Sequence, residues 1–240
     1  MTDVLTGRSG LVVLVDPGRS TPADAEALAE RAAGEGACAL LVGDSFGPVG
    51  GWAATVGALR RGAPGLPVLQ LPATAAHLCA HVDAVLLLSL VSGRNAQYLI
   101  EEHVRAVPFF ERHPDVGVVS TAYILVDGGR VTSVESVSQT RPLPADKPEL
   151  VAAHVRASRL IGMRATYLEA GSGALRPVAP ALVRAARDAG DGPLFVGGGV
   201  RDADGVRRAR DAGADFVVVG TGLEEEGPRL VRALAHAARA

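Results

Sequence analysis

The stretch Leu194-Phe195-Val196-Gly197-Gly198-Gly199 is a short apolar run that ends in three glycines. The same order, an apolar run and then a glycine turn, occurs at Tyr167–Gly173 (YLEAGSG) and at Gly220-Thr221-Gly222. The turns are spaced by roughly one strand and one helix, so in a parallel barrel all three would expose backbone N–H groups at one rim. A (β/α)₈ barrel holds a phosphate on the loops after its last strands in this way.

Throughout the chain, short runs rich in β-branched residues and leucine alternate with alanine-rich helical stretches. This alternation predicts βαβ units and a parallel sheet. The runs are Leu11–Val15, Ala39–Val42, Val68–Leu71, Ala84–Leu88, Val116–Ala122, Ala165–Leu168, Leu194–Val196 and Phe216–Val219. They number eight, and the 240 residues are close to the usual length of such a barrel. We therefore expect an α/β protein with one (β/α)₈ (TIM barrel) domain over residues 1–240.

Two segments depart from the regular alternation. The interval between Leu71 and Ala84 barely accommodates a full helix with its loops, so we expect the third helix to be missing or vestigial. After the fifth strand, Val126–Val131 (VDGGRV) has the composition of a hairpin turn, and Thr132-Ser133-Val134 favours extended backbone. This pattern predicts a small β insertion after strand 5, placed as a lid over the rim.

Composition narrows the classes of function. Apolar residues make up 48% of the chain and the net charge is −2, which indicates a packed globule and gives no sign of a nucleic-acid partner. Cys38 and Cys79 lie in apolar surroundings without metal-ligand spacing, so we expect two free thiols. The sequence has neither a signal-peptide pattern nor an apolar run long enough to span a membrane. We expect a cytoplasmic protein.

The glycine turns are the candidate phosphate site. Gly198 and Gly199 let the backbone approach an anion closely, and Gly220 and Thr221 offer the same after the last strand. A tight turn without a ligand is the alternative for either turn taken alone. Two consecutive turns at the positions that form the phosphate site of this barrel favour the anion.

Glu169 is the candidate catalytic residue. It follows the apolar run Ala165–Leu168, and catalytic groups in barrels lie at the carboxyl ends of strands. A carboxylate there can take a proton from a hydroxyl bound beside the phosphate. The alternative is a strand-end carboxylate held by a buried arginine. For Tyr167 the choice is between donating its hydroxyl to the phosphate and packing in the core.

The first two strands end in possible metal ligands. Asp16 follows strand 1, and Asp44-Ser45 follows strand 2, so their side chains would be neighbours on the rim. Carboxylate and hydroxyl oxygens with waters suit an Mg²⁺ ion shared with a ligand phosphate. Asp16 and the Asp44-Ser45 pair could equally cap turns or a helix. Arg94, after strand 4, is either a diphosphate ligand or part of a structural ion pair.

These residues together resemble one family. The chain is similar almost end to end to the geranylgeranylglyceryl phosphate synthases, prenyltransferases of archaeal ether-lipid synthesis that have bacterial relatives. The resemblance is carried by YLEAGSG at 167–173, VGGGVR at 196–201, VGT at 219–221, SLVSGRN at 89–95 and RPLPADKPE at 141–149. It implies a TIM barrel without a regular third helix.

The resemblance also implies a reaction, in which a polyprenyl diphosphate is joined to a hydroxyl of sn-glycerol 1-phosphate with loss of diphosphate. Glu169 would deprotonate that hydroxyl, and Asp16 and Ser45, helped by Asp44, would hold the Mg²⁺ cofactor. The prenyl chain would lie in an apolar groove beside the missing helix, near Leu71, Leu88 and Tyr98. The implied glycerol-phosphate site comprises Tyr167, Leu168, Glu169, Ala170, Gly171, Ser172, Gly173, Gly198, Gly199, Gly220 and Thr221. By the same resemblance we expect the protein to be a homo-oligomer. We expect it to have no membrane span, and we expect any contact with a membrane to be peripheral.

The chain departs from the family pattern on the Mg²⁺ and diphosphate side. Gly18 and Arg19 stand where the family has an acid and a lysine, Asp44 replaces a glycine, and Gly93 replaces a common serine. These changes keep two other interpretations open. One is a phosphosugar isomerase or lyase built on the same phosphate site, and the other is a catalytically silent barrel that binds a phosphorylated ligand.

Overall fold

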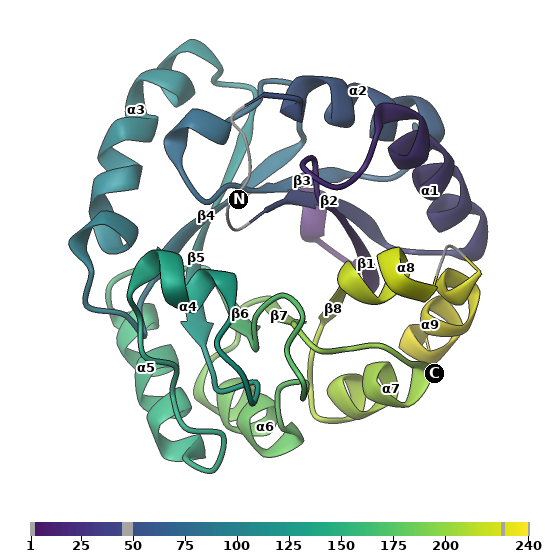
Figure 1. Cartoon of the computed structure of the whole chain (residues 1–240). Coiled ribbons are helices and arrows are strands. Elements are labelled where there is room, and N and C mark those ends of the chain that lie inside the picture. Colours follow the sequence, from purple (N-terminus) through teal and green to yellow (C-terminus); the bar gives the residue numbers. More distant parts are fainter. Residues whose placement is uncertain (1–2, 45–49, 227–228, 240) are drawn as a thin grey trace.

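The computed structural model describes residues 3–44, 50–226 and 229–239. Within them, eight parallel strands pair in chain order and close a barrel, with helices around the outside (Figure 1). The strands are β1 (Gly10–Val15), β2 (Ala39–Gly43), β3 (Val68–Leu71), β4 (Ala84–Leu90), β5 (Gly117–Leu125), β6 (Ala165–Glu169), β7 (Leu194–Gly197) and β8 (Phe216–Val219). The predicted fold class is confirmed.

The helices follow the strands, with three short irregular ones among them. The α-helices are α1 (Pro22–Glu35), α2 (Trp52–Gly62), α3 (Glu102–Arg112), α4 (Ser133–Ser138), α5 (Pro148–Leu160), α6 (Pro180–Ala189), α7 (Ala203–Asp211), α8 (Thr221–Glu226) and α9 (Leu230–Arg239). Two 3₁₀ turns, η1 (Asp3–Leu5) and η2 (Ala75–His77), and the π-helix η3 (Gln97–Glu101) complete the set. Helix α1 begins at a capping box formed by Thr21 and Asp24, with Pro22 as its first residue.

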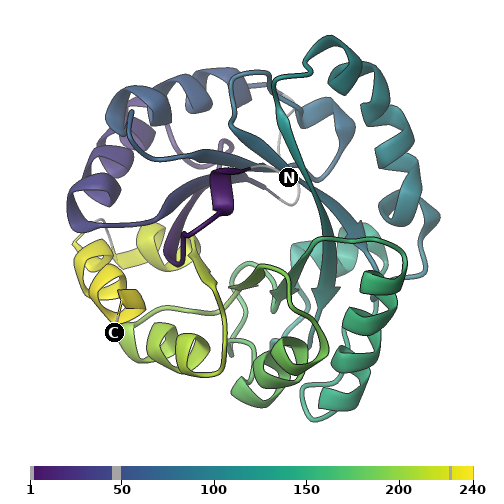
Figure 2. The same cartoon turned by 180° about the vertical axis from the view of Figure 1, so that it is seen from behind.

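Side chains alternate along each strand between two apolar layers. Leu168, Val196 and Val217 belong to the outer layer, between the barrel wall and the helices. Inside the barrel, Phe195 stacks on Phe216 with 4.5 Å between ring centroids. Figure 2 shows η1 lying across the amino-terminal end of the barrel, where Leu5 joins the inner layer. Apolar side chains thus fill the barrel at the amino-terminal ends of the strands, and open space lies at the carboxyl-terminal ends.

The third helix is vestigial, as expected. Between β3 and β4 the chain forms only the three-residue turn η2. The two strands pair at only two positions, Leu69 with Ala84 and Gln70 with Val85, whereas β4 pairs with β5 along its whole length. The upper part of β4 therefore separates from β3.

The predicted β insertion after strand 5 is wrong. Instead of a hairpin, the segment forms the short helix α4, preceded by extended Thr132 and ended by Gln139 at φ 55°. Val134 and Val137, three residues apart, both line the cavity described below, so tertiary packing outweighs the β propensity of valine. Gly128 serves close packing instead of a hairpin, since a Cβ there would lie 2.5 Å from the Ala170 carbonyl oxygen.

No helix in the described part of the chain is both long and apolar enough to cross a membrane. Both cysteines are free thiols, and burial raises the pKa of Cys38 to about 11.

Candidate active site

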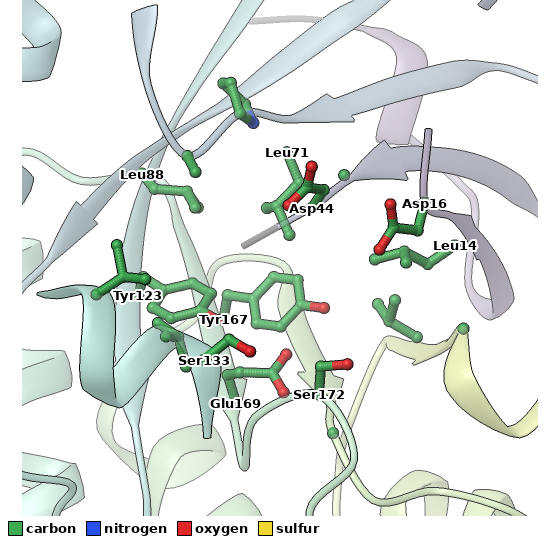
Figure 3. Close-up of a pocket in the computed structure, with 18 of the residues that line it drawn as sticks. Leu14, Asp16, Asp44, Leu71, Leu88, Tyr123, Ser133, Tyr167, Glu169 and Ser172 are labelled. Atoms are coloured by element: carbon green, nitrogen blue, oxygen red, sulfur yellow. The ribbon is translucent and has the colours of Figure 1, made fainter. Parts of the chain in front are cut away.

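A cavity of about 390 Å³ opens at the carboxyl end of the barrel. One arm is polar and includes Glu169, Gly198, Gly199, Gly220 and Thr221. The other arm is mainly apolar and runs toward β3, β4 and α3. Figure 3 shows Tyr167, Glu169 and Ser172 on one side of the cavity, with Asp16 and Asp44 across from them. The sequence thus brings residues from all parts of the chain to one opening.

The glycine turn after β7 requires glycine for two separate reasons. Gly198 and Gly199 have φ of 81° and 70°, which side chains rarely adopt. A Cβ on Gly198 would also lie 2.3 Å from Glu169 Oε1 and 2.6 Å from the Gly171 nitrogen. The turns after β6 and β7 therefore pack against each other through bare backbone.

Side chains of the turns after β6 and β8 meet beside this contact. The hydroxyl groups of Ser172 and Thr221 are 3.1 Å apart and face the polar arm. Thr221 is the first residue of α8, and Gly220 lies against Leu14, whose Cδ2 would be 2.8 Å from an added Cβ. Backbone N–H groups and small hydroxyls without a bulky side chain suit a phosphate group.

Glu169 is a buried carboxyl with an altered acidity in this arm. Its side chain is only 8% exposed, and burial raises its pKa from 4.5 to about 7. Hydrogen bonds from the Gly171 N–H, at 2.6 Å, and from the Tyr167 hydroxyl lower the pKa and so limit the rise. Burial also raises the pKa of Tyr167 well above its ordinary range, so its hydroxyl stays a donor. Glu169 is therefore a carboxyl that exchanges its proton near neutral pH, as a general base requires. The alternative of a carboxylate held by a buried arginine is not what the structure contains.

Across the cavity, Asp16 and Asp44 both line the wall. Asp16 accepts a hydrogen bond from the Gly18 nitrogen at 2.7 Å and pairs with Arg19 at 3.6 Å. No group of three or more His, Cys, Asp and Glu side chains that could hold a metal occurs in the described ranges. Mg²⁺ needs no such cage, because it is commonly bound by one or two carboxylates, waters and substrate phosphates. The two aspartates fit that donor set. Ser45 lies outside the described residues.

The apolar arm passes through the barrel wall. Leu87 packs with the outer layer and Leu88 with the inner layer, yet both line the same cavity. This is possible because β3 and β4 separate above Val85. Leu71 and Tyr98 also line the arm, so the groove lies where the resemblance places it, beside the missing helix.

Some predicted site residues do not line the cavity. Leu168 and Ala170 are buried in the outer layer, and Gly171 acts through its N–H on Glu169. Arg94 is exposed and hydrogen-bonds to the Gly93 carbonyl oxygen, outside the cavity wall. Contact of these four with substrate stays a prediction.

Other lining residues were missed in the sequence. Tyr123 is buried in the cavity wall, with its ring 5.3 Å from that of Tyr167, its pairing partner on β6. Strand 5 was expected to end at Ala122, one residue too early to include it. An aromatic hydroxyl near the end of an apolar strand was the available signal. Ser133 of α4 and His103 of α3 also line the cavity, and the sequence offered no distinguishing pattern for either.

Residues 2–238 match the PcrB family model. The chain belongs to the PcrB family. The predicted resemblance to geranylgeranylglyceryl phosphate synthases is confirmed by named relatives of similar length. The geranylgeranylglyceryl phosphate synthase of Spirosoma linguale is 38% identical to this chain over 235 residues, which cover 98% of this chain and 93% of the relative. That of Methanothrix thermoacetophila is 41% identical over 226 residues, covering 93% of this chain and 87% of the relative.

A solved structure of the same fold agrees. The (S)-3-O-geranylgeranylglyceryl phosphate synthase of Thermoplasma acidophilum, in complex with its substrate sn-glycerol-1-phosphate, superposes with a TM-score of 0.90 at 25% identity. The superposition covers 98% of this chain and 96% of that one.

Proposed function

We propose that this PcrB-family chain is a phosphoglycerol prenyltransferase. It joins a polyprenyl diphosphate to a hydroxyl of sn-glycerol 1-phosphate and releases diphosphate. The observation that carries the proposal is a cavity in which a proton-accepting carboxyl, Glu169, lies between the glycine turns after β6, β7 and β8 (the glycine cradle) and an apolar arm. The relatives named geranylgeranylglyceryl phosphate synthase support the same reaction.

The acceptor binds in the polar arm. Its phosphate contacts the backbone N–H groups of Gly198, Gly199 and Gly220 and the hydroxyls of Ser172 and Thr221, all of which line or face this arm. The glycerol hydroxyl then lies toward Glu169. Burial excludes competing water, and this favours proton transfer from the hydroxyl to the carboxylate.

The chemical step forms a carbon–oxygen bond. As Glu169 accepts the proton, the hydroxyl oxygen attacks C1 of the prenyl chain, and the bond between C1 and the diphosphate oxygen breaks. Diphosphate leaves with the bonding electron pair. Arg19 lines the cavity beside Asp16, and its positive charge favours the departing anion.

We propose that Asp16 and Asp44, with Ser45, hold Mg²⁺ on the diphosphate side. When bound there, the ion neutralises charge on the leaving diphosphate. The chain's own contribution is to present two carboxylates at the cavity wall opposite Glu169. Asp44 supplies a carboxylate where the family pattern has a glycine.

The direct test is incorporation of label. The protein is incubated with Mg²⁺, sn-glycerol 1-phosphate and radiolabelled prenyl diphosphates of ten to thirty-five carbons, and the products are extracted into organic solvent. We expect an acid-stable ether product that depends on the acceptor. The sn-glycerol 3-phosphate enantiomer is the matched control for acceptor recognition. Failure to form ether with every donor would rule out the proposed reaction and leave a binding protein or another phosphate-site enzyme.

Tyr167→Phe is expected to move the pH profile of kcat/KM. The Tyr167 hydroxyl donates to Glu169 and lowers its pKa, so its removal raises that pKa above about 7. Because activity needs the ionised carboxylate, the acidic limb should move upward by about one pH unit, with smaller changes at high pH. Tyr123→Phe is the control, since its ring lies beside Tyr167 but no hydrogen bond links its hydroxyl to Glu169 among those described. If the acidic limb of the pH profile is unchanged in Tyr167→Phe, the assignment of Glu169 as the base whose pKa the Tyr167 hydroxyl lowers is contradicted.

A further inference from the structure

The wall of the apolar arm on the β3 side is irregular backbone. Thr74, Ala75 and Leu78 line the cavity in the place where a third helix would pack. An irregular segment leaves main-chain N–H and C=O groups that need partners when buried. The partners supplied here show what keeps this wall in position.

Gln70 on β3 provides two of these partners. Its side chain is 0% exposed and shares the outward face of the strand with Val68, which packs in the outer layer. The amide nitrogen donates to the His77 carbonyl oxygen at 2.5 Å, and the amide oxygen accepts from the Cys79 nitrogen at 3.1 Å. An amide thus occupies a position where an apolar side chain would contact a regular helix.

Glu102 on α3 holds the other end of the same wall. Its Oε2 accepts from the Ala75 nitrogen at 2.8 Å, while its Oε1 accepts from Arg105 at 2.7 Å. The imidazole of His77 also stacks on the Trp52 ring, 4.6 Å between centroids, which ties the segment to α2. Two side chains from opposite flanks therefore fix Ala75, His77 and Cys79 through three hydrogen bonds.

We propose that Gln70 and Glu102 are positioning residues that set the width of the apolar arm and thereby select the prenyl chain of the donor. The inference rests on the proposed function, since it assumes that the arm holds this chain. The glycine turns of the polar arm follow β6, β7 and β8. Gln70 and Glu102 lie on other elements, so they act on the donor and leave acceptor binding unaffected. Gln70 acts through the Ala75–Cys79 backbone without lining the cavity.

Gln70→Met tests the inference, because methionine has a similar length and can form neither hydrogen bond. We expect the KM for the best prenyl diphosphate to rise at least fivefold, while the KM for glycerol 1-phosphate stays within twofold. The relative kcat/KM among donors of different chain length should also flatten. Affinity for an unreactive analogue, with sulfur bridging the prenyl chain and diphosphate, should fall in parallel with the rise in KM.

Two sets of variants separate positioning from general loss of structure. Thr121→Val removes a buried hydrogen bond, from the Thr121 hydroxyl to the Val119 carbonyl at 2.8 Å, on a strand position outside the cavity wall. It should leave donor selectivity unchanged. Glu102→Gln keeps an acceptor for the Ala75 nitrogen and should behave like the parent protein, whereas Glu102→Met should behave like Gln70→Met.

The outcomes are distinct from those of the proposed function. An unchanged donor profile in both Gln70→Met and Glu102→Met, or an equal weakening of analogue and inorganic phosphate binding, overturns the inference. The parent protein could make no ether and yet bind the analogue, with that binding lost in the two variants alone. This result would contradict the proposed reaction and support the positioning role of Gln70 and Glu102. A parent protein that does not bind the analogue overturns the inference.

Discussion

Glu169→Gln is expected to lower kcat by about 10²- to 10⁴-fold and, at the same time, to stabilise the folded protein. The loss of activity follows from removal of the base. The gain in stability follows from the pKa of Glu169, which is about 7 in the folded protein against 4.5 ordinarily. Between these values the folded state keeps a proton that the unfolded state releases, so parent stability falls as pH rises through this window.

The size of the gain can be estimated from this difference in pKa. It corresponds to about 3 kcal/mol by pH 8, or a rise in Tm of about 6 to 12 °C for a chain of this length. Thermal unfolding of parent and Glu169→Gln at pH 4 and pH 8 measures it, with little difference expected at pH 4, below the ordinary pKa of the carboxyl. Glu30→Gln, on the exposed face of α1, is the control and should match the parent at both values. If Glu169→Gln is less stable than the parent at pH 8, the ionised carboxylate of Glu169 stabilises the fold and the expected gain is contradicted.

Gly198→Ala is expected to weaken acceptor binding severely. The added methyl group would lie 2.3 Å from Glu169 Oε1 at a residue with φ 81°, so the turn must move away from the turn after β6. We expect the KM for glycerol 1-phosphate to rise at least a hundredfold, and binding of inorganic phosphate to be lost. Stability should fall by about 2 to 4 kcal/mol, since backbone strain and a steric clash act together.

Gly162→Ala separates these two effects. Gly162 has φ 88°, but an added Cβ would meet nothing within 4 Å. This variant should lose only about 1 to 2 kcal/mol from strain and keep the parental KM. A Gly198→Ala protein that binds glycerol 1-phosphate like the Gly162→Ala control would exclude the turn after β7 from the phosphate site.

The barrel and its polar arm were predictable because strict local rules specify them. Buried parallel strands are continuous apolar runs, and glycine turns after them mark the anion-binding rim. Glu169 was assigned from its position at a strand end alone. Its altered pKa was not predictable, since it depends first on the depth of burial, although Tyr167 lies two residues earlier on the same face of the strand.

The parts that escaped prediction depend on packing between distant segments. Thr132-Ser133-Val134 was expected to be extended because the contact of Val134 with the cavity is not visible in the sequence. Gly93, which departs from a common serine, has a reason that only the structure gives: a Cβ would lie 2.6 Å from the Thr140 hydroxyl oxygen. Gln70 looks like an ordinary polar residue in a short strand until its two main-chain contacts are known.

The separation of β4 from β3 gives this closed barrel a free strand edge, which closed barrels otherwise lack. A free edge with apolar neighbours can pair with another chain, so it has to be covered. His103 of α3 does so at one point, where its Nε2–H donates to the Leu88 carbonyl oxygen at 2.6 Å. The opening that we propose for the prenyl chain is thus also a strand edge that needs cover, so His103→Ala should promote self-association as well as alter the groove.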